Sequence, residues 1–579
     1  MRTRNNGELR LSNVNEIVTL VGWCSKKRNL GGLIFIDLRD RYGITQVVVE
    51  PNNACYELAE TVKSEYVLKI TGKVVERSSK NLNIPTGEVE VVASEFVIIN
   101  TSEQPPFLIQ DNTDALEDTR MKYRYLDLRR PVLQKNLITR HKICMALRNF
   151  LDKRDFIEIE TPMLGKSTPE GARDFLVPSR IYHGQFYALP QSPQIYKQLL
   201  MVAGYERYFQ IARCFRDEDL RADRQLEFTQ LDLEMSFIDE EDIFEVGEQM
   251  LKNLWKEVLD YDVPTPFIRM EYDHAMNYYG SDKPDTRFEM LLNDITETVK
   301  PMEFTLFQNV ITNGGNIKCI VAKDAANKYS RKEIDRLTLF AKKYHASGLA
   351  WLKYENDAFA GSIAKFLNPE VSSALVEQLG LSNNDLVLIV ADKLEVCNFS
   401  LGALRLQLGK ELQLIDEKKF NFLWVVNWPL FEYSEEEGRY MAAHHPFTSP
   451  KDGHENMLFD HPELCRAKAY DVVLNGYELG GGSIRIFNQD IQAKMFKAIG
   501  LSEEEIELQF SFFVNALKYG TPPHGGFALG LDRIAMLMTY NNSLREVIAF
   551  PKAASSKCQM SEAPTPVSEK QLKELGLKL

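Results

Sequence analysis

The feature that most constrains this chain is a run of strict alternation between residues 228 and 237. Its apolar members are Leu231, Leu233, Met235 and Phe237. Because successive side chains of a β-strand point to opposite faces, the residues between them share the other face. These are Phe228, Gln230, Asp232 and Glu234. An aromatic ring, an amide and two carboxylates on one face predict a floor for a polar ligand with a flat ring, although alternation alone would favour an ordinary half-buried strand.

The loop before this strand favours the ligand site. It gathers three arginines among four carboxylates: Arg216, Arg221 and Arg224 beside Asp217, Glu218, Asp219 and Asp223. Arginine is suited to bidentate capture of phosphate or carboxylate. The loop and the strand together therefore predict a binding site for an anionic ligand.

The length of 579 residues is too great for one hydrophobic core, and three or four domains are expected. No apolar run approaches the ~20 residues that a transmembrane helix needs, and the N-terminus lacks the apolar stretch of a signal peptide, so no membrane partner is expected. The eight cysteines occur singly, without a C-x-x-C pair. Neither a zinc site nor a disulfide framework is therefore expected, and a reducing cytoplasm fits best.

Five short β-branched segments lie near the N-terminus, at 17–23, 32–37, 44–49, 66–72 and 88–92. They predict a small closed barrel, with the OB-fold as the leading candidate. A helix is expected at about 132–152, and the stretch 286–424, which carries no chemical motif, predicts an inserted domain. The expected domains are a barrel (1–104), a linker (105–135), a core in two parts (136–285 and 425–555), the insertion (286–424) and a C-terminal extension (556–579).

The net charge of −13 argues against indiscriminate binding to nucleic acid. Phosphate contacts depend, however, on where the basic residues sit, and the run 26–28 (Lys-Lys-Arg) is one such place. A solvated loop is the simpler interpretation of that run alone.

A second candidate site lies at 471–485. Asn475-Gly476 is the preferred two-residue hairpin turn, which would pair Leu474 with Tyr477 and the preceding valine with Glu478. Asp471 and Glu478 would then be diagonal neighbours about 7–8 Å apart and could hold Mg²⁺ together with substrate phosphates. The pair alone fits two hydrated acids on a surface hairpin equally well. The glycines at 480–482, which would let a nucleotide approach the backbone, and Arg485 favour the site.

A third candidate site lies at 525–537, where an apolar strand reaches Gly530 and a helix follows. Arg533 would lie near the helix N-terminus, whose free N–H groups and dipole attract anions. The tetrapeptide 530–533 (Gly-Leu-Asp-Arg) would be weak evidence without the other two sites.

These stretches resemble the three signature motifs of class II aminoacyl-tRNA synthetases: 156–162 the first, 215–237 the second, and 530–533 with its helix the third. The closer resemblance is to bacterial aspartyl-tRNA synthetases, carried by the segments 167–174, 191–198, 215–225 and 444–448. It covers nearly the whole chain and departs from the usual pattern at Leu226, where Pro is common. It implies a multidomain α+β protein with an N-terminal OB-fold β-barrel, an antiparallel-sheet catalytic core and an α+β insertion domain.

The resemblance also implies a reaction: L-aspartate is activated with ATP, pyrophosphate leaves, and aspartate passes to the 3′ end of tRNA-Asp. The implied aspartate ligands are Gln194, Lys197, Arg216 and Arg485, and of these Arg485 binds the side-chain carboxylate. Glu170 and Asp232 are implied to face the α-amino group. His444 and His445 are implied to close the pocket. The implied ATP ligands are Arg216, Asp217, Glu218, Gln225, Phe228, Glu478, Gly530, Leu531, Asp532 and Arg533, with Asp471 and Glu478 on Mg²⁺.

Arg216, Arg533 and Glu478 are the implied catalytic residues. The attacking group is the substrate's own carboxylate, already ionised, so the site must align the reactants and neutralise charge rather than supply a base. Lys197 and Arg485 would form a cationic pocket in which asparagine leaves two cations poorly paired. That loss would exceed the ~1–3 kcal/mol of a steric mismatch.

The same resemblance makes the barrel the reader of the tRNA anticodon. Phe35 would stack on a base, Gln46 would hydrogen-bond one, and Arg28 would contact the tRNA nearby. Leu30 resembles the residue of enzymes restricted to tRNA-Asp rather than those that also charge tRNA-Asn. A homodimer is implied, because the first motif forms the dimer contact in this family.

Three rival functions differ in what they require. An asparaginyl- or lysyl-tRNA synthetase shares the barrel and core, but Lys197 and Arg485 favour an acidic substrate. A non-catalytic tRNA-binding paralogue predicts a broken ATP site, whereas all four of its key residues are present: Arg216, Phe228, Glu478 and Arg533. An ATP-dependent amide ligase on the same core would not need the N-terminal barrel.

Overall fold

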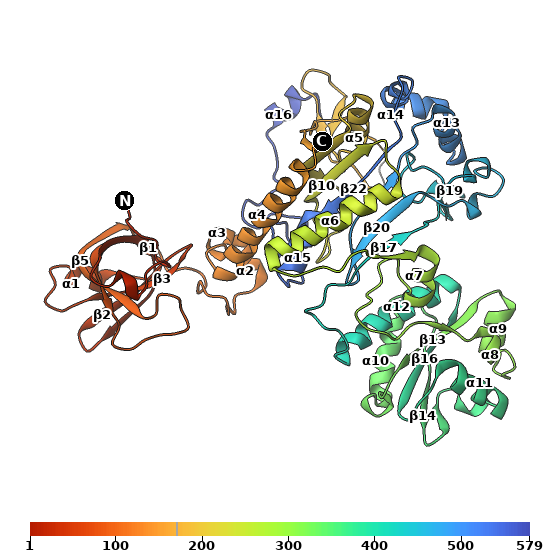
Figure 1. The fold of residues 1–579 in the computed structure, drawn as a ribbon, viewed down its shortest axis with the longest axis horizontal. Helices are drawn as coiled ribbons and strands as arrows, with labels where there is room; N and C mark the ends of the chain where they lie inside the picture. The colour runs from red at the N-terminus through yellow and green to blue at the C-terminus, as the bar shows by residue number, and fades with distance from the viewer. Residues whose placement is uncertain (169–171, 579) are drawn as a thin grey trace. The chain divides into compact units, whose positions relative to one another are not determined.

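The computed structural model describes residues 1–168 and 172–578, and its contacts divide the chain into two compact units (Figure 1). The first unit comprises Met1–Lys142, Asp219–Leu226 and Ala535–Leu572. The second comprises Ile143–Glu218, Glu227–Ile534 and Lys573–Leu579. A short piece of the second-motif loop, Asp219–Leu226, therefore belongs to the N-terminal unit, which the predicted linear order of domains did not include.

The N-terminal part of the first unit is a closed five-stranded barrel with the strand order β1-β2-β3-β5-β4. Its strands are β1 (Ile17–Leu30), β2 (Leu33–Asp40), β3 (Gly43–Val49), β4 (Val67–Glu76) and β5 (Val89–Asn100), with α1 (Tyr56–Thr61) between β3 and β4. Alternate residues of each strand fill the interior; Leu20, Ile36 and Ile70 are completely buried. The prediction of five strands in an OB-fold barrel is confirmed.

A hinge of two short helices, α2 (Glu117–Lys122) and α3 (Arg124–Asp127), follows the barrel and leads into the long helix α4 (Pro131–Asp152). Buried ion pairs organise it. Asp127 is fully buried and accepts hydrogen bonds from Arg124 at 2.7 Å and Arg130 at 2.9 Å. The barrel is tied to the hinge in the same way, since Glu65 lies 2.8 Å from Arg39 and 2.7 Å from Arg129.

The second unit contains an eight-stranded sheet in the order β11-β17-β20-β21-β22-β10-β9-β6, antiparallel except at β11–β17 and β6–β9 (Figure 1). Its strands are β6 (Ile157–Glu158), β9 (Arg207–Phe215), β10 (Glu227–Ser236), β11 (Ile268–Glu271), β17 (Phe422–Val426), β20 (Ala469–Leu474), β21 (Tyr477–Ile484) and β22 (His524–Gly530). Helix α6 (Glu240–Leu259) buries Phe244, Leu251 and Trp255 against this sheet, and Asp239 caps its N-terminus.

Helices and small hairpins complete the core. They are α5 (Gln194–Val202), α7 (Tyr272–Tyr279), α13 (Gln489–Ala498), α14 (Glu503–Ala516), α15 (Leu531–Met538) and α16 (Glu569–Glu574), with the strand pairs β7 (Leu176–Pro178) and β8 (Phe186–Ala188), and β18 (Phe431–Ser434) and β19 (Arg439–Ala442). Among the described residues, no helix has the length and apolarity required to cross a bilayer.

One residue of the alternating run does not behave as predicted. Leu231, Leu233 and Met235 are buried, but β10 ends at Ser236 and Phe237 is 66% exposed. Its backbone turns into the left-handed region at φ = 60°, where its N–H bonds the carbonyl of Pro523 at 2.7 Å. The strand has therefore already ended, so the period of two no longer governs Phe237.

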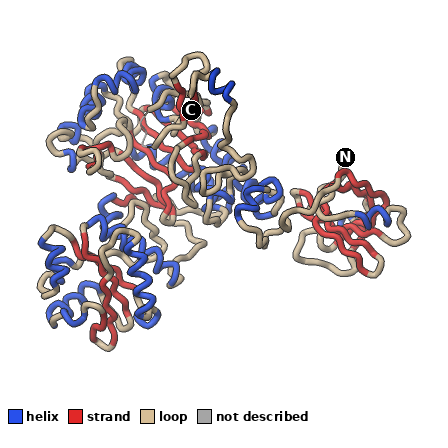
Figure 2. The backbone as a smooth tube through the Cα atoms, turned by 180° about the vertical axis from the view of Figure 1, so that it is seen from behind, coloured by secondary structure: helices blue, strands red, loops and turns tan. Residues whose placement is uncertain are grey.

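The insertion is a separate α+β layer structure with its own five-stranded sheet in the order β12-β13-β16-β14-β15. The strands are β12 (Asn293–Asp294), β13 (Asn316–Ala322), β14 (Ala350–Glu355), β15 (Ala358–Gly361) and β16 (Asp385–Asp392). Helices α10 (Arg331–Lys342) and α12 (Leu394–Glu411) pack with one apolar cluster, and α8 (Thr296–Val299), α9 (Thr305–Thr312) and α11 (Pro369–Leu379) with another (Figure 2). Because β17 begins at Phe422, the core sheet resumes before residue 424, the predicted end of the insertion.

Candidate active site

The polar face of β10 carries two buried carboxylates, each paired with a buried cation. Lys197, on α5, lies with its Nζ 3.0 Å from Asp232 and 3.6 Å from Glu234. All three side chains are at most 1% exposed. Burial raises the pKa of Asp232 against the opposing charge of Lys197. Burial would also raise the pKa of Glu234, but Arg485 and Lys197 outweigh it and the pKa falls.

Arg485 follows β21 and is held by a complete set of acceptors. Its guanidinium donates to both oxygens of Glu234 at 2.9 and 3.2 Å, to Ser483 Oγ at 2.7 Å and to the Gly526 carbonyl at 3.3 Å. The fifth acceptor is His445 Nε2 at 2.9 Å. Guanidinium has five N–H groups, so each one finds an acceptor. Burial opposes the charged form, but Glu234 overcomes it and raises the pKa of Arg485.

A glycine makes the Arg485–Glu234 pair possible. Strand β22 lies between β21 and β10, and its Gly526 is opposite both Ser483 and Glu234. A Cβ at Gly526 would lie 2.2 Å from Glu234 Oε2. The ion pair therefore spans a strand that has no side chain at the crossing point.

The two predicted histidines lie beside Arg485 and are neutral. Burial, and then the positive charge of Arg485, lower the pKa of His444 to about 4. The same causes lower the pKa of His445 well below its usual range. His444 also packs edge-on against Trp428, with ring centroids 5.0 Å apart.

The predicted excess of positive charge is not what this pocket contains. Lys197 and Arg485 are matched by Asp232 and Glu234, and the neutral histidines add no charge. The physical reason is that isolated buried cations are costly, so a folded protein supplies carboxylates in the same cluster. Selection for an acidic substrate must therefore come from the geometry of donors and acceptors rather than from net charge.

Several predicted site residues have a buried polar atom without a hydrogen-bond partner in the described part of the chain. These atoms are Gln194 Nε2, Asp232 Oδ2, Arg216 Nε and His444 Nδ1. Unsatisfied buried polar atoms are uncommon in folded proteins because each costs about 1–3 kcal/mol. Their occurrence together at predicted ligand positions is what a substrate site requires.

The predicted nucleotide-binding residues also come together in part. The Arg216 guanidinium lies 5.1 Å from the centroid of Phe228, and Arg533, on the first turn of α15, donates to the carbonyl of Glu478. Asp532 accepts a hydrogen bond from the Thr229 N–H at 2.8 Å, and Leu531 is completely buried. These two side chains therefore hold α15 against β10, while Gly530 lies half-buried at the end of β22.

Three further predicted ATP ligands have other contacts or surroundings. Gln225 belongs to the first compact unit, where its side chain exchanges hydrogen bonds with the backbone of Lys552 at 2.8 and 3.2 Å. The backbone N–H of Asp217 bonds the carbonyl of Arg173 at 3.0 Å, and its neighbour Glu218 is half-buried. Glu170, predicted to face the α-amino group, lies outside the described residues.

The predicted hairpin forms with the predicted turn. Asn475 and Gly476 both have positive φ, and Leu474 pairs with Tyr477 and Val473 with Glu478. A bulge then shifts the register, so that Asp471 pairs with Gly481. Burial, followed by the charge of Glu478, raises the pKa of Asp471 well above its usual value, so the two carboxylates remain electrostatically coupled.

The three glycines are required by close packing inside the sheet. A Cβ at Gly480 or Gly482 would lie 1.9 or 2.0 Å from backbone oxygens of β22. At Gly481 it would lie 2.0 Å from an Asp471 carboxylate oxygen. These glycines therefore admit the neighbouring strand and the Asp471 side chain, and the approach of a nucleotide to their backbone stays a prediction.

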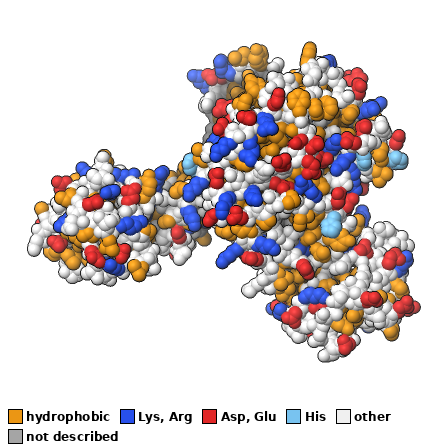
Figure 3. Space-filling view, viewed as in Figure 1, with side chains coloured by type: hydrophobic (Ala, Val, Ile, Leu, Met, Phe, Trp, Pro, Cys, Tyr) orange, Lys and Arg blue, Asp and Glu red, His pale blue; other side chains and the backbone are white. Residues whose placement is uncertain are grey.

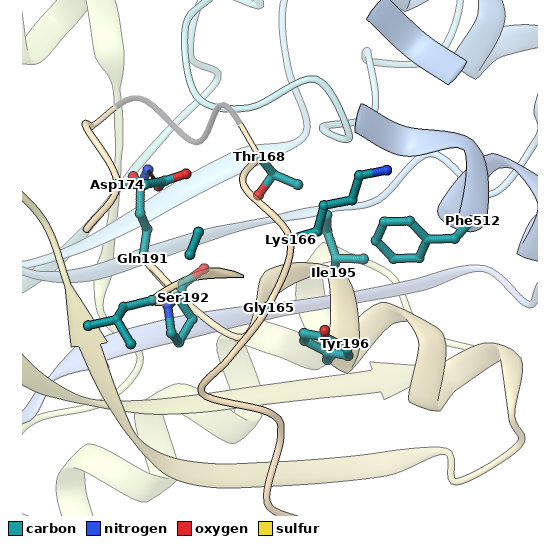
Figure 4. Close-up of a pocket in the computed structure, with 12 residues that line it drawn as sticks. Gly165, Lys166, Thr168, Asp174, Gln191, Ser192, Ile195, Tyr196 and Phe512 are labelled. Atoms are coloured by element: carbon teal, nitrogen blue, oxygen red, sulfur yellow. Dashed lines mark hydrogen bonds between the residues drawn. The ribbon is translucent and has the colours of Figure 1, made fainter. Parts of the chain in front are cut away.

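A small cavity lies beside α5, lined by Ile195 and Tyr196 of that helix (Figure 4). Asp174 and Gln191 lie together on one side of it, and Phe512 of α14 lies on another. Its volume of about 30 Å³ is suited to water, not to aspartate or a nucleotide.

The predicted anticodon residues gather on one face of the barrel. Arg28 and Phe35 are directly opposite on β1 and β2, with the guanidinium 6.0 Å from the ring centroid. Arg28 also donates to Gln46 at 3.2 Å, on β3. Leu30 is 60% exposed at the end of β1, where Gly31 and Gly32 both have positive φ. Figure 3 shows acidic and basic side chains interspersed over the visible surface of the molecule.

The structure adds residues that the sequence did not assign. In the pocket they are Ser483 and Gly526, and on the barrel they are Asp37, Arg77 and Glu90. Glu234, which the alternation placed on the polar face, gains Arg485 as its partner. Asp37 and Ser483 could have been found, because each stands two residues along the chain from a predicted site residue. The others come from more distant positions in the chain, and no local pattern indicates them.

Comparisons with known proteins agree with this architecture. Residues 116–554 match the family described as tRNA synthetases class II (D, K and N), and residues 18–99 match the OB-fold nucleic acid binding domain. The curated "Aspartate--tRNA(Asp/Asn) ligase" of Bacillus mycoides (strain KBAB4) is 57% identical, and that of Bacillus anthracis (strain A0248) is 56% identical. Each comparison covers 100% of this chain and 98% of the relative.

Two solved structures share the fold. Asparaginyl-tRNA synthetase from Pyrococcus horikoshii, complexed with asparaginyl-adenylate, is similar with a TM-score of 0.58 and 18% identity, covering 94% of this chain and 96% of that chain. A putative aspartyl-tRNA synthetase from Leishmania major Friedlin gives a TM-score of 0.59 and 17% identity, covering 95% and 94%. Together with the motifs and the full-length relatives, these matches show that the chain belongs to the class II tRNA synthetases and, within them, to the bacterial aspartyl-tRNA synthetases.

Proposed function

We propose that this aspartyl-tRNA synthetase activates L-aspartate with ATP on the polar face of β10 and then transfers it to tRNA-Asp. The observation that carries the assignment of the pocket is the set of unsatisfied buried atoms, which includes Asp232 Oδ2 and Gln194 Nε2. Gln194 lies one turn before Lys197 on α5, so an acceptor and two donor side chains belong to the same cluster. An α-ammonium and a carboxylate supply the missing partners.

The proposed aspartate contacts follow from which atoms remain available. Asp232 Oδ2 accepts from the α-ammonium, with Glu170 as a second acceptor. Lys197 uses one donor on Asp232 and keeps two for a substrate carboxylate. Arg485 binds the side-chain carboxylate when an oxygen of that group replaces the neutral His445 nitrogen.

This arrangement discriminates aspartate from asparagine through hydrogen-bond polarity. The amide of asparagine would turn N–H donors toward Arg485, which has only donors. A donor facing a donor leaves both unpaired in a dry pocket, and such mismatches give large discrimination. The pocket therefore selects a carboxylate although it has no net positive charge.

The activation step requires alignment and neutralisation of charge. The aspartate α-carboxylate attacks the α-phosphorus, and Arg216 stabilises the charge that develops there. Arg533 binds the terminal phosphate, Glu218 and Gln225 contact the nucleotide, and Phe228 stacks on adenine. Because the nucleophile is already ionised, no side chain has to remove a proton.

Asp471 and Glu478 are proposed to hold Mg²⁺. Their fit to a cation rests on the raised pKa of Asp471, caused by burial and by the charge of Glu478. No group of three or more His, Cys, Asp or Glu suited to a metal occurs in the described residues, so the protein would supply two carboxylates and the phosphates further oxygens. Bound Mg²⁺ would supply positive charge at the phosphates.

The barrel is proposed to bind the anticodon through Phe35, Gln46 and Arg28. Leu30 predicts restriction to tRNA-Asp, whereas both relatives described above have names that include tRNA(Asp/Asn). The relatives match over the full length and Leu30 is one residue, so we propose that this enzyme charges tRNA-Asn as well. Charging of purified tRNA-Asn at less than about one-hundredth of the tRNA-Asp rate, a difference of roughly 2.7 kcal/mol, would reverse this assignment.

A homodimer and a cytoplasmic location complete the proposal. Strand β6 lies within the first motif, residues 156–162, and is the last strand at one edge of the sheet, where a second copy would pack. Sedimentation of a monomer would contradict the dimer. None of the eight cysteines, all within the described residues, forms a disulfide, which agrees with a reducing compartment.

The experiment that tests the substrate is amino-acid-dependent exchange of pyrophosphate into ATP, with aspartate, asparagine and lysine offered separately. Exchange with aspartate alone supports the proposed pocket. Exchange with asparagine or lysine would show that the pocket is wrongly assigned, although the fold assignment would stand. No exchange with any of the three would favour a non-catalytic tRNA-binding protein.

A further inference from the structure

Arg124, on the hinge helix α3, is a buried arginine whose partners are mostly backbone oxygens. Arg124 is only 3% exposed. The guanidinium donates to Asp127 at 2.7 Å, to the carbonyls of Ile548 and Ala549 at 2.9 Å each, and to the carbonyl of Arg545. Arg124 therefore satisfies three backbone acceptors of one short segment at once.

This segment, residues 545–549, depends on side chains for its hydrogen bonds. It continues a single 3-10 turn, so its carbonyls lack the regular partners of a helix or strand. Asn136 donates to the Glu546 carbonyl at 3.0 Å, and Arg545 bonds Glu117 at 2.7 Å. The hinge thus determines the path of 545–549 from several sides.

The same segment is bracketed by two contacts with the second-motif loop. On one side, the Leu544 N–H donates to the Ala222 carbonyl at 3.0 Å. On the other, Gln225 accepts from the Lys552 N–H at 2.8 Å and donates to the Lys552 carbonyl at 3.2 Å. Gln225 is 6% exposed, so these bonds hold it in one position.

All of these residues lie in the first compact unit, which explains why the loop piece 219–226 is grouped with the barrel and hinge. The charge of Arg124 is balanced by Asp127, which is completely buried. A buried pair of this kind holds one geometry, because any displacement leaves charges and carbonyls unpaired.

We propose that Arg124 is a positioning residue for ATP activation. It holds the segment 544–552, and this segment holds Gln225 in the second-motif loop. The inference rests on the proposed contact between Gln225 and ATP and extends it to a residue of the hinge. It predicts that a change at Arg124 affects the use of ATP but not the binding of aspartate, because the aspartate pocket lies in the second compact unit.

The test compares Arg124→Met with a matched control, Arg405→Met. Arg405 is also a buried arginine that donates to three consecutive carbonyls, those of Phe288, Glu289 and Met290, at 2.6–3.1 Å. It lies in the insertion, away from the proposed ATP ligands in sequence. Both variants lose hydrogen bonds to three carbonyls, so Tm should fall in both. Arg124→Met also removes one partner of Asp127, which keeps Arg130 at 2.9 Å.

The kinetics of pyrophosphate exchange distinguish a specific effect on the use of ATP from a general loss of stability. For Arg124→Met, kcat/KM for ATP should fall by about tenfold or more, while KM for aspartate stays within about twofold. Arg405→Met should leave both within about twofold. An unchanged kcat/KM for ATP in Arg124→Met, or an equal loss in both variants or for both substrates, would overturn the proposal.

A double variant tests whether Gln225 is the route. If Arg124 acts through Gln225, then Arg124→Met with Gln225→Ala should be no worse for ATP than Gln225→Ala alone. That route would be refuted if the losses of kcat/KM for ATP in the two single variants multiply in the double variant. It would also be refuted if Gln225→Ala has the wild-type kcat/KM for ATP. Arg124→Lys keeps a positive charge beside Asp127 but lacks the several N–H donors of the guanidinium. It should therefore recover only part of the loss in kcat/KM for ATP. Failure of wild-type protein to exchange with aspartate would instead refute the proposed function itself.

Discussion

Replacing Arg485 with leucine tests the central ion pair of the pocket. The substitution removes a side chain that is 1% exposed and leaves Glu234, which is completely buried, without its two closest donors. Breaking a buried pair by removing one partner costs about 3–5 kcal/mol. Lys197 remains 3.6 Å from Glu234, which places the expected cost at the lower end, about 3 kcal/mol.

The magnitude can be separated from the loss of packing by a second change. Glu234→Gln in the Arg485→Leu background removes the uncompensated charge and should restore about 2 kcal/mol, since a neutral amide is cheaper to bury than a carboxylate. Neither variant should exchange pyrophosphate with aspartate, because both lack the guanidinium. Stability and activity are therefore expected to respond differently to the second change.

Thermal unfolding and pyrophosphate exchange measure the two responses. A loss of 3 kcal/mol corresponds to a fall in Tm of about 6–12 °C for a domain of this size. The reasoning is refuted if Arg485→Leu unfolds within about 1 °C of wild type, or if the double variant is no more stable than the single one. Near-normal exchange with aspartate in Arg485→Leu would show that the pocket is wrongly assigned.

Other predictions use the remaining sites. His444 has a pKa of about 4 when folded and a higher one when unfolded, so the unfolded state binds more protons between these values and stability falls as pH drops through that window. His444 alone should account for about 2 kcal/mol of the loss in urea unfolding between pH 7 and pH 5, so His444→Gln should lose about 2 kcal/mol less than wild type while the contribution of His445 remains. Asp471→Asn should raise Tm in the absence of Mg²⁺, because burial and the charge of Glu478 penalise the charged form of Asp471. The same substitution should abolish any rise in Tm that depends on Mg²⁺-ATP. A lower Tm without Mg²⁺ together with a retained Mg²⁺-ATP-dependent rise would show that Asp471 is not part of the metal site. Phe35→Ala should cost about 1–3 kcal/mol in tRNA binding and leave pyrophosphate exchange unchanged, and a loss of exchange would contradict the separation of the two functions.

Local sequence patterns predicted much of the fold. The β-branched segments predicted the five barrel strands, and the alternation predicted which residues of β10 face the pocket. Asn475-Gly476 predicted both the turn and the first two cross-strand pairs. These succeeded because the period of a strand and the preference for positive φ are properties of adjacent residues.

The failures occurred where adjacent residues do not decide. The bulge after Val472 and the end of β10 before Phe237 depend on what the neighbouring strand allows. The predicted cationic pocket failed for the same reason, since Glu234 and Arg485 are 251 positions apart in the chain.

The sequence by itself therefore determined which residue types this protein offers to aspartate, ATP and tRNA, and on which strand faces they stand. Tertiary structure decided how those residues are paired. The order β21-β22-β10 brings Arg485 to Glu234 across Gly526, which balances the buried charges, and the contacts of Arg124 join the hinge to the segment 545–549. Pairing of buried charges is a property of three-dimensional packing, because the free energy of each charge depends on neighbours that the chain brings together only when it folds.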